Sequence, residues 1–334
     1  SFFMILPLGL AACIPVLFSL GNEEKGTARR FDFIGFFCIA IAIGSLQLMF
    51  DRGQRLDWFY STEIIIECSL AVGFFYFFAV HATFAREPLF DARTFRDRNL
   101  VLGILFAFFM GMLQYTPMIL FPALLQDLRG YPESIIGYLI AMRGVGNFLS
   151  FFVVAQLTRM NPRLTFCTGL LIQGVAGVWM GSLDMNMTTS DVIFTNLLHG
   201  FGFGLAYTPM AVLTFSTLAP NLLTQGNAIF SLMRMLGSSM FISIILVVFI
   251  QSSASAQAYL VGFVNVFNAD LMAPWLAHFG TIDSATFSRL AGEQVRKQAA
   301  MIGYINAFHL LTLVPFLAAP ATLLFRVRRA GDPL

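Results

Sequence analysis

The stretch NLVLGILFAFFMGMLQYTPMILFPALL runs from Asn99 to Leu125 and contains no Lys, Arg, Asp or Glu. An α-helix needs about 20 mainly apolar residues to cross the roughly 30 Å hydrocarbon core of a bilayer. In lipid the backbone polar groups must be satisfied within the segment, which a helix achieves. The stretch therefore predicts a transmembrane helix, and similar runs recur along the chain.

The composition agrees with this interpretation, since 57% of the residues are hydrophobic and 11% are charged. Soluble domains carry about 25% charged residues. A closed β-barrel would need short alternating strands, whereas the apolar runs here are continuous. The sequence predicts an all-α polytopic membrane protein whose nine spans are Phe2–Leu20, Phe33–Phe50, Ile64–Phe84, Asn99–Leu125, Ser134–Leu157, Leu164–Leu183, Val192–Leu218, Gly226–Gln251 and Ala299–Phe325.

The distribution of Lys and Arg predicts the orientation, because cytoplasmic connections are enriched in both. The connections between nine spans lie alternately on the two sides of the membrane. The connections and tail on one side carry twelve Lys and Arg residues, and those on the other side carry six. We assign the richer side, with the tail at 326–334, to the cytoplasm. The polar segment 252–298 then lies outside as a solvated connector. Its part Phe287–Gln298 predicts a short amphipathic helix on the membrane interface.

Two arginines lie deep within predicted spans, where a charge costs about 2.5–3.5 kcal/mol on insertion scales. They are Arg143 in the fifth span and Arg234 in the eighth, and each should face the bundle interior or a water-filled cavity. They either line a translocation route and bind an anionic group, or cap backbone carbonyls and hold two helices together. Both interpretations stay open for Arg143, and the second is favoured for Arg234.

Other polar residues within the spans could hydrogen-bond a substrate or join neighbouring helices. Pro117 and Pro122 predict a kink in the fourth span, and a broken helix is where transporters often place binding groups. Gly200–Gly204 and the pair Gly177 and Gly181 predict close helix approach. The substrate-pathway candidates, besides the two arginines, are Gln114, Tyr115, Asn147, His199 and Asn227.

Glu67, in the third span, is the deepest carboxylate of the chain. A proton-coupled pump needs a titratable group inside the membrane, so Glu67 is the proton-coupling candidate. No nucleophile elbow, metal-ligand spacing or phosphate loop is present, and we expect no catalytic residue, no metal and no cofactor other than the proton gradient. The formal net charge of +2 gives no indication of a nucleic-acid partner.

Several stretches resemble the major facilitator superfamily, in particular its fourteen-helix drug:proton antiporters of the EmrB/QacA type. The most specific is Gly44–Phe59, which is similar to the connection between that family's two extra central helices. Met142–Gly146 resembles an Arg-Gly-Leu-Gly phrase, and Gln156–Arg163, with Arg159 and Arg163, resembles the cytoplasmic gating loop. Gly200–Pro209 and Asn227–Gly237 match two further helices.

The resemblance implies a domain organisation and a larger protein. Residues 1–20 would be the last helix of the amino-half bundle, 33–84 the two extra central helices, and 99–325 the carboxy-half bundle of six helices. The chain would then be a carboxy-terminal fragment, and the antiporter motif with the main proton-binding carboxylates would lie in upstream sequence. The implied location is the bacterial cytoplasmic (inner) membrane.

The resemblance also implies a function, namely proton-coupled efflux of small lipophilic molecules by alternating access, with a periplasmic adaptor as a possible partner. Two alternatives stay open. One is a permease of the same fold for another solute such as a siderophore, because no residue encodes the direction of transport. The other is a non-transporting membrane component, although no helix shows the polar stripe expected of a channel.

Overall fold

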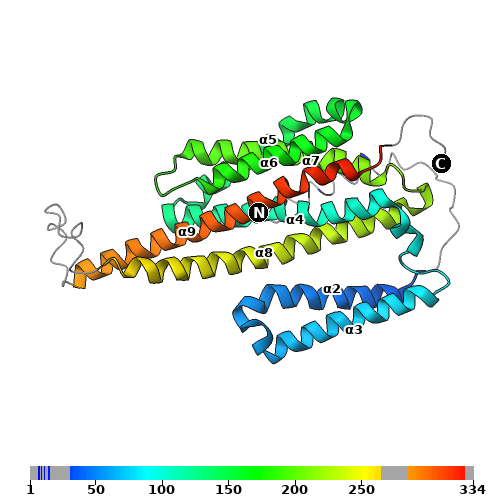
Figure 1. The fold of residues 1–334 in the computed structure, drawn as a ribbon, viewed down its shortest axis with the longest axis horizontal. Coiled ribbons are helices and arrows are strands. Elements are labelled where there is room, and N and C mark those ends of the chain that lie inside the picture. Colours follow the sequence, from blue (N-terminus) through cyan, green and yellow to red (C-terminus); the bar gives the residue numbers. More distant parts are fainter. Residues whose placement is uncertain are drawn as a thin grey trace.

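The computed structural model describes residues 31–264 and 285–327, together with a few single positions before residue 16. In this part the chain forms helices and no strands (Figure 1). The long helices are α2 (Phe33–Gly53), α3 (Thr62–Phe84), α4 (Arg98–Arg129), α5 (Glu133–Met160), α6 (Pro162–Gly181), α7 (Thr189–Phe215), α8 (Leu223–Val261) and α9 (Ala285–Ala318).

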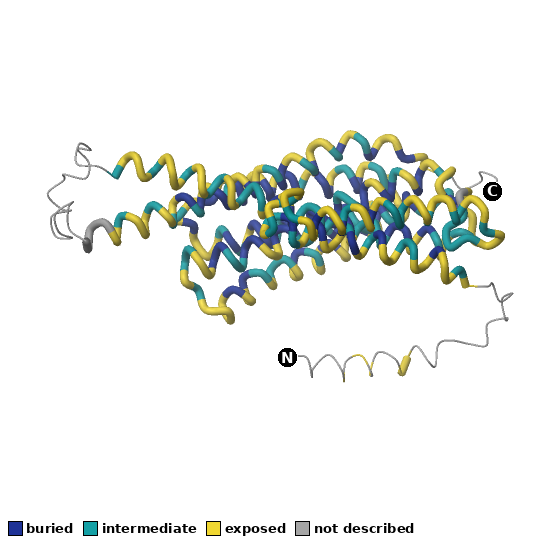
Figure 2. The backbone as a smooth tube through the Cα atoms, turned by 90° about the horizontal axis from the view of Figure 1, so that it is seen from below, coloured by how far each residue is buried: buried dark blue, intermediate teal, exposed yellow. Residues whose placement is uncertain are grey.

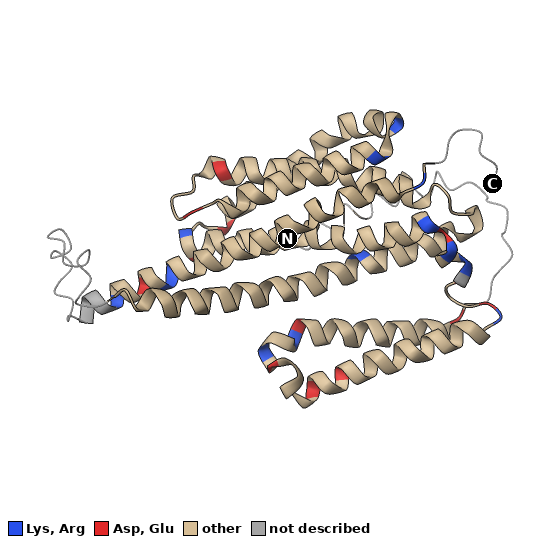
Figure 3. Ribbon diagram, in the orientation of Figure 1, with Lys and Arg blue, Asp and Glu red and all other residues tan. Residues whose placement is uncertain are grey.

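Each of these helices is long and apolar enough to cross a membrane. This confirms the predicted spans two to nine, while the first, Phe2–Leu20, lies outside the described residues. Charged residues gather towards the two ends of the helices and leave the middle sections largely uncharged (Figure 3). Such a distribution is expected of helices that cross the hydrocarbon core.

Polar side chains fix where several helices begin. The Asp97 side chain accepts a hydrogen bond from the Leu100 N–H at the start of α4. At the start of α6, the Asn161 side chain accepts a hydrogen bond from the Leu164 N–H, and Pro162 lies in the first turn. Both arrangements satisfy N–H groups that have no partner within the helix. At the other end of α4, Gly130 adopts a φ of 63°, a conformation that favours glycine.

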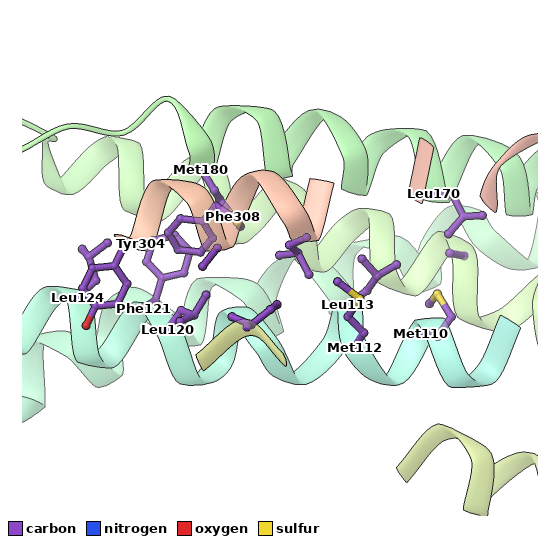
Figure 4. Close-up of a cluster of buried hydrophobic side chains, with 14 of the residues drawn as sticks. Met110, Met112, Leu113, Leu120, Phe121, Leu124, Leu170, Met180, Tyr304 and Phe308 are labelled. Atoms are coloured by element: carbon purple, nitrogen blue, oxygen red, sulfur yellow. The ribbon is translucent and has the colours of Figure 1, made fainter. Parts of the chain in front are cut away.

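Helices α4 to α9 form one bundle whose core is built around α4. Figure 4 shows side chains of α4 meeting side chains of α9, and the Phe121 and Phe308 ring centroids are 5.1 Å apart. Buried positions lie inside the bundle, and exposed positions follow its outer surface (Figure 2). That surface carries many exposed large apolar side chains, which lipid can solvate.

Two helix crossings in the bundle are backbone-to-backbone contacts at glycines. Where α5 crosses α7, a Cβ on Gly146 would overlap the Leu197 carbonyl oxygen, and one on Gly200 would overlap that of Arg143. Where α4 crosses α8, a Cβ on Gly111 would overlap the Arg234 carbonyl oxygen, and one on Gly237 would overlap that of Phe108. The glycines predicted in α7, and those at 177 and 181 in α6, are confirmed as sites of close approach.

A buried asparagine closes the end of the bundle at which α4 begins. The Asn99 amide donates to the Leu213 carbonyl oxygen at 3.0 Å and to the Arg326 carbonyl oxygen at 2.7 Å. Its own oxygen accepts from the Arg326 N–H at 2.8 Å. Next to it, the buried Phe325 ring packs on Phe106, with centroids 5.5 Å apart. One side chain thereby joins the start of α4, the end of α7 and the segment after α9.

The hairpin of α2 and α3 lies beside the bundle and packs on α8 (Figure 1). At one end the Asp32 carboxylate accepts hydrogen bonds from the Gly35 N–H, from His81 Nε2 at 2.8 Å and from the Leu89 N–H at 3.1 Å. Burial acts to raise the pKa of Asp32, but these hydrogen bonds outweigh burial and hold the pKa below its ordinary value. At the other end, Arg52 pairs with Glu63.

Two sequence predictions are wrong. Phe287–Gln298 is not a separate interfacial helix but part of α9, and α8 continues to Val261, so both helices extend into the expected connector. The 39 residues of α8 measure about 58 Å at 1.5 Å per residue, well beyond a 30 Å core. The paired ends of α8 and α9 project past the other helices (Figures 1 and 2). Helix α4 continues as one helix through Pro117 and Pro122.

Candidate functional site

The candidate site begins with a defect in α4 that Pro117 creates. Proline has no backbone N–H, so the carbonyl of the residue four positions earlier, Leu113, loses its helical hydrogen-bond partner. Arg143, from α5, occupies that vacancy: its Nη2 donates to the Leu113 carbonyl oxygen at 3.2 Å. A side chain from a neighbouring helix therefore satisfies the freed group, which is how membrane proteins tolerate such prolines.

The second deep arginine reaches the same turn of α4 from α8. Arg234 Nη1 donates to the Gln114 side-chain oxygen at 3.3 Å. The two guanidinium groups thus bind consecutive residues, Leu113 and Gln114. Within the described ranges, neither guanidinium is paired with a carboxylate. Two positive charges therefore converge on the middle of the bundle with no carboxylate partner among the described residues.

A cavity of about 420 Å³ opens at this point between α4, α5 and α7. Its long polar side chains come from Gln114, Arg143 and Asn147. No Asp or Glu is among its lining residues, so the wall has a single positive charge on an otherwise apolar surface. The other lining residues are Met118, Gly137, Ile140, Ala141, Gly144, Gly200 and Phe203.

The two arginines differ in their access to this cavity. Arg143 lines it. Arg234 is not a lining residue, and its Nε is buried without a hydrogen-bond partner among the described residues. Arg143 is therefore placed both to cap a backbone carbonyl and to meet a ligand, whereas Arg234 connects α8 to α4.

The structure brings four of the five other pathway candidates near this site and leaves one away from it. Gln114 and Asn147 line the cavity, and the half-buried Tyr115 adjoins it in the chain. His199 neighbours the lining residue Gly200, but it is buried, and neither of its ring nitrogens has a hydrogen-bond partner among the described residues. Asn227 is exposed in the first turns of α8, two helical turns before Arg234.

The remaining candidates lie in other parts of the molecule. Glu67 is buried in α3, and its Oε2 has no hydrogen-bond partner among the described residues. Arg159 is exposed in the last turn of α5, and Arg163 is half-buried at the start of α6, across the turn at Asn161. Proton coupling and gating, if these residues perform them, take place away from the cavity. No cluster of three potential metal ligands occurs in the part of the chain that the structure describes.

Sequence reasoning missed a repeat that explains how the site is built. Tyr115-Thr-Pro-Met118 in α4 recurs as Tyr207-Thr-Pro-Met210 in α7. Met142-Arg143-x-x-Gly146 in α5 recurs as Met233-Arg234-x-x-Gly237 in α8. In both copies the glycine three residues after the arginine is a crossing point of two helices. Comparing the fourth and fifth spans with the seventh and eighth would have revealed this from sequence.

These features define a polytopic α-helical membrane protein with a positively charged cavity inside a bundle of repeated helix pairs. The model of the Major Facilitator Superfamily matches residues 1–242, well over half of the chain. The chain belongs to this family.

Three curated relatives are named for resistance or export. The chain is 29% identical over 275 residues to the multidrug export protein EmrB of Escherichia coli K12, covering 81% of this chain and 54% of that protein. It is 26% identical over 246 residues to the fatty acid resistance protein FarB of Neisseria gonorrhoeae (73% and 48%). It is 24% identical over 239 residues to the multidrug resistance protein Stp of Mycobacterium tuberculosis H37Rv (71% and 44%). The chain spans about half the length of these relatives.

Proposed function

We propose that this chain is part of a secondary transporter that exports small lipophilic molecules across a bacterial cytoplasmic membrane by alternating access, driven by the proton gradient. The observation that carries the proposal is the cavity between α4, α5 and α7, whose apolar wall holds the Arg143 guanidinium. An apolar cavity with a few convergent polar groups is the usual form of a small-molecule site. Relatives named for multidrug export and fatty acid resistance support this substrate class.

In this proposal the helices take the roles that the family resemblance implies. Residues 1–20 belong to the amino-half bundle, α2 and α3 are the additional pair, and α4 to α9 form the carboxy-half bundle. Arg159 and Arg163 belong to a cytoplasmic gating loop. Glu67 is the proton-coupling residue in this proposal, since it is a carboxylate within a membrane-spanning helix whose Oε2 is buried and has no hydrogen-bond partner among the described residues. The projecting ends of α8 and α9 are where a periplasmic adaptor would bind.

The test is transport by the complete transporter in inverted membrane vesicles. Arg143→Ala should abolish accumulation of a lipophilic dye driven by a pH gradient, while the amount of inserted protein stays the same. Arg96→Ala removes an exposed arginine between α3 and α4 and should leave transport unchanged. Unaltered transport by the Arg143 variant would refute the assigned role.

Glu67→Gln provides a separate test of coupling. The variant should lose gradient-driven accumulation but keep exchange of substrate across the membrane at equal pH, because exchange needs no net proton movement. Gradient-driven accumulation at the unmodified rate would contradict the role of Glu67 and leave the cavity assignment intact.

A further inference from the structure

The Arg143 guanidinium donates to a backbone carbonyl that is free to accept only because residue 117 is a proline. The Leu113 carbonyl would accept a helical hydrogen bond if residue 117 had an N–H. Instead it accepts from Arg143 Nη2 at 3.2 Å. A guanidinium has five N–H donors, and the hydrogen bond to Leu113 uses one of those of Arg143. The others have no carboxylate partner among the described residues, and the side chain lines the cavity.

We propose that Pro117 positions Arg143: the guanidinium stays on the proline-freed Leu113 carbonyl while the cavity is empty, and the anionic group of an entering amphiphile takes the guanidinium over. This rests on the proposed function and specifies its binding step. A neutral carbonyl is a weaker partner for a guanidinium than a carboxylate, which can accept two parallel hydrogen bonds. The carbonyl therefore holds the cation in place without competing strongly enough to exclude the ligand.

The second copy of the repeat shows that this arrangement is not a general property of the sequence motif. Pro209 in α7 stands in the same Tyr-Thr-Pro-Met context and frees the Leu205 carbonyl. Within the described residues no side chain donates a hydrogen bond to that carbonyl, and Arg234 instead donates to Gln114. Only the copy that faces the cavity couples its proline to its arginine, so Pro209 is a matched control for Pro117.

The experiment measures binding of a fluorescent dodecanoate to the complete transporter in nanodiscs, with the alcohol of the same chain length as a neutral probe. Pro117→Ala supplies the missing N–H to the Leu113 carbonyl, releases Arg143 and should tighten dodecanoate binding about tenfold, the size expected for one hydrogen bond to a charged group. Arg143→Met should weaken it at least as much. In the Arg143→Met background, Pro117→Ala should have no effect, because the two changes act through one contact.

Two comparisons exclude a general effect of the proline on the helix. Pro209→Ala should leave dodecanoate binding unchanged, and the alcohol should bind equally to all variants. Pro117→Val provides the same N–H with a side chain closer to proline in volume. It replaces Pro117→Ala if the alanine variant folds poorly, and the same tightening of dodecanoate binding is expected.

The inference is overturned if Pro117→Ala changes dodecanoate binding equally with and without Arg143, or leaves it unchanged. In that case the proposed function stands, because binding still depends on Arg143. If dodecanoate binds without any contribution from Arg143, both the inference and the assigned site are wrong.

Discussion

The α4–α9 bundle and the α2–α3 hairpin are both built from apolar helices long enough to cross a membrane, yet they hold together in different ways. In the most apolar part of each helix, the buried share of residues is 56% in α4, α6 and α7, 39% in α9 and 22% in α5 and α8, against 17% in α2 and in α3. Lipid tails are as apolar as leucine, so burial from lipid provides no hydrophobic driving force, and close packing and hydrogen bonds must hold helices together. The bundle uses backbone contacts at glycines, and the hairpin depends on polar contacts near its ends.

The largest difference should appear when a side chain is added to a helix crossing. Gly146→Val would place atoms where the Leu197 carbonyl of α7 now lies, and overpacking of this kind costs about 1–3 kcal/mol or more. Gly44→Val is the matched change in the hairpin, because a Cβ there meets nothing within 4 Å. Thermal unfolding in detergent should show a much lower midpoint for the first variant and little change for the second. Equal midpoints would contradict the packing difference.

The next effect concerns the polar closure of the bundle. Asn99→Ala removes the hydrogen bonds to Leu213 and Arg326 and leaves buried backbone groups without partners, a loss of about 2 kcal/mol. Asn221→Ala, at an exposed position before α8, serves as the control. The free energy of unfolding should fall for the first variant alone. If both variants unfold like the parent, the Asn99 contacts contribute nothing to stability.

The smallest effect is a response to acid that should be confined to the hairpin. Because the pKa of Asp32 is lowered in the folded protein, its stabilising contribution is complete above the ordinary value of about 3.8 and is lost as the pH falls through the lower, folded value. The expected loss is about 1 kcal/mol. A spin label at Cys38 of the hairpin should become more mobile below pH 4, and one at Cys167 of the bundle should not.

The control for this prediction is Asp32→Asn, which should make the label at Cys38 equally mobile at all pH values. An acid response that persists in this variant would assign the effect to another group.

The sequence predicted the positions of the spans well, because hydropathy and span length are local properties of the chain. It also predicted that Arg143 would face the bundle interior or a cavity, since a charge in lipid must face protein or water, and Arg143 lines the cavity beside Gln114 and Asn147. It failed for Phe287–Gln298, where polar residues suggested a surface helix. Those residues continue α9 as one helix, and composition alone does not distinguish such an extension from a separate surface helix.

The partner of Arg143 could not be read from the sequence for a different reason. The proline that frees the Leu113 carbonyl is visible in the chain, but which side chain reaches the carbonyl depends on how α5 crosses α7 and packs beside α4. Tertiary packing also decides why Arg143 lines the cavity while Arg234, in the same local motif, does not. The local sequence therefore identified Arg143 and Arg234 as charges within the spans but did not determine their roles.

The most direct test of the account is to fill the cavity without disturbing the bundle. Gly144 lines the cavity, and a Cβ there meets nothing within 4 Å, so Gly144→Leu should occupy the space next to Arg143 and leave the thermal midpoint unchanged. The account predicts that this variant of the complete transporter no longer binds a lipophilic probe that the parent binds. Binding at the parent's affinity, with the leucine in place and the protein folded, would show that the substrate site lies elsewhere.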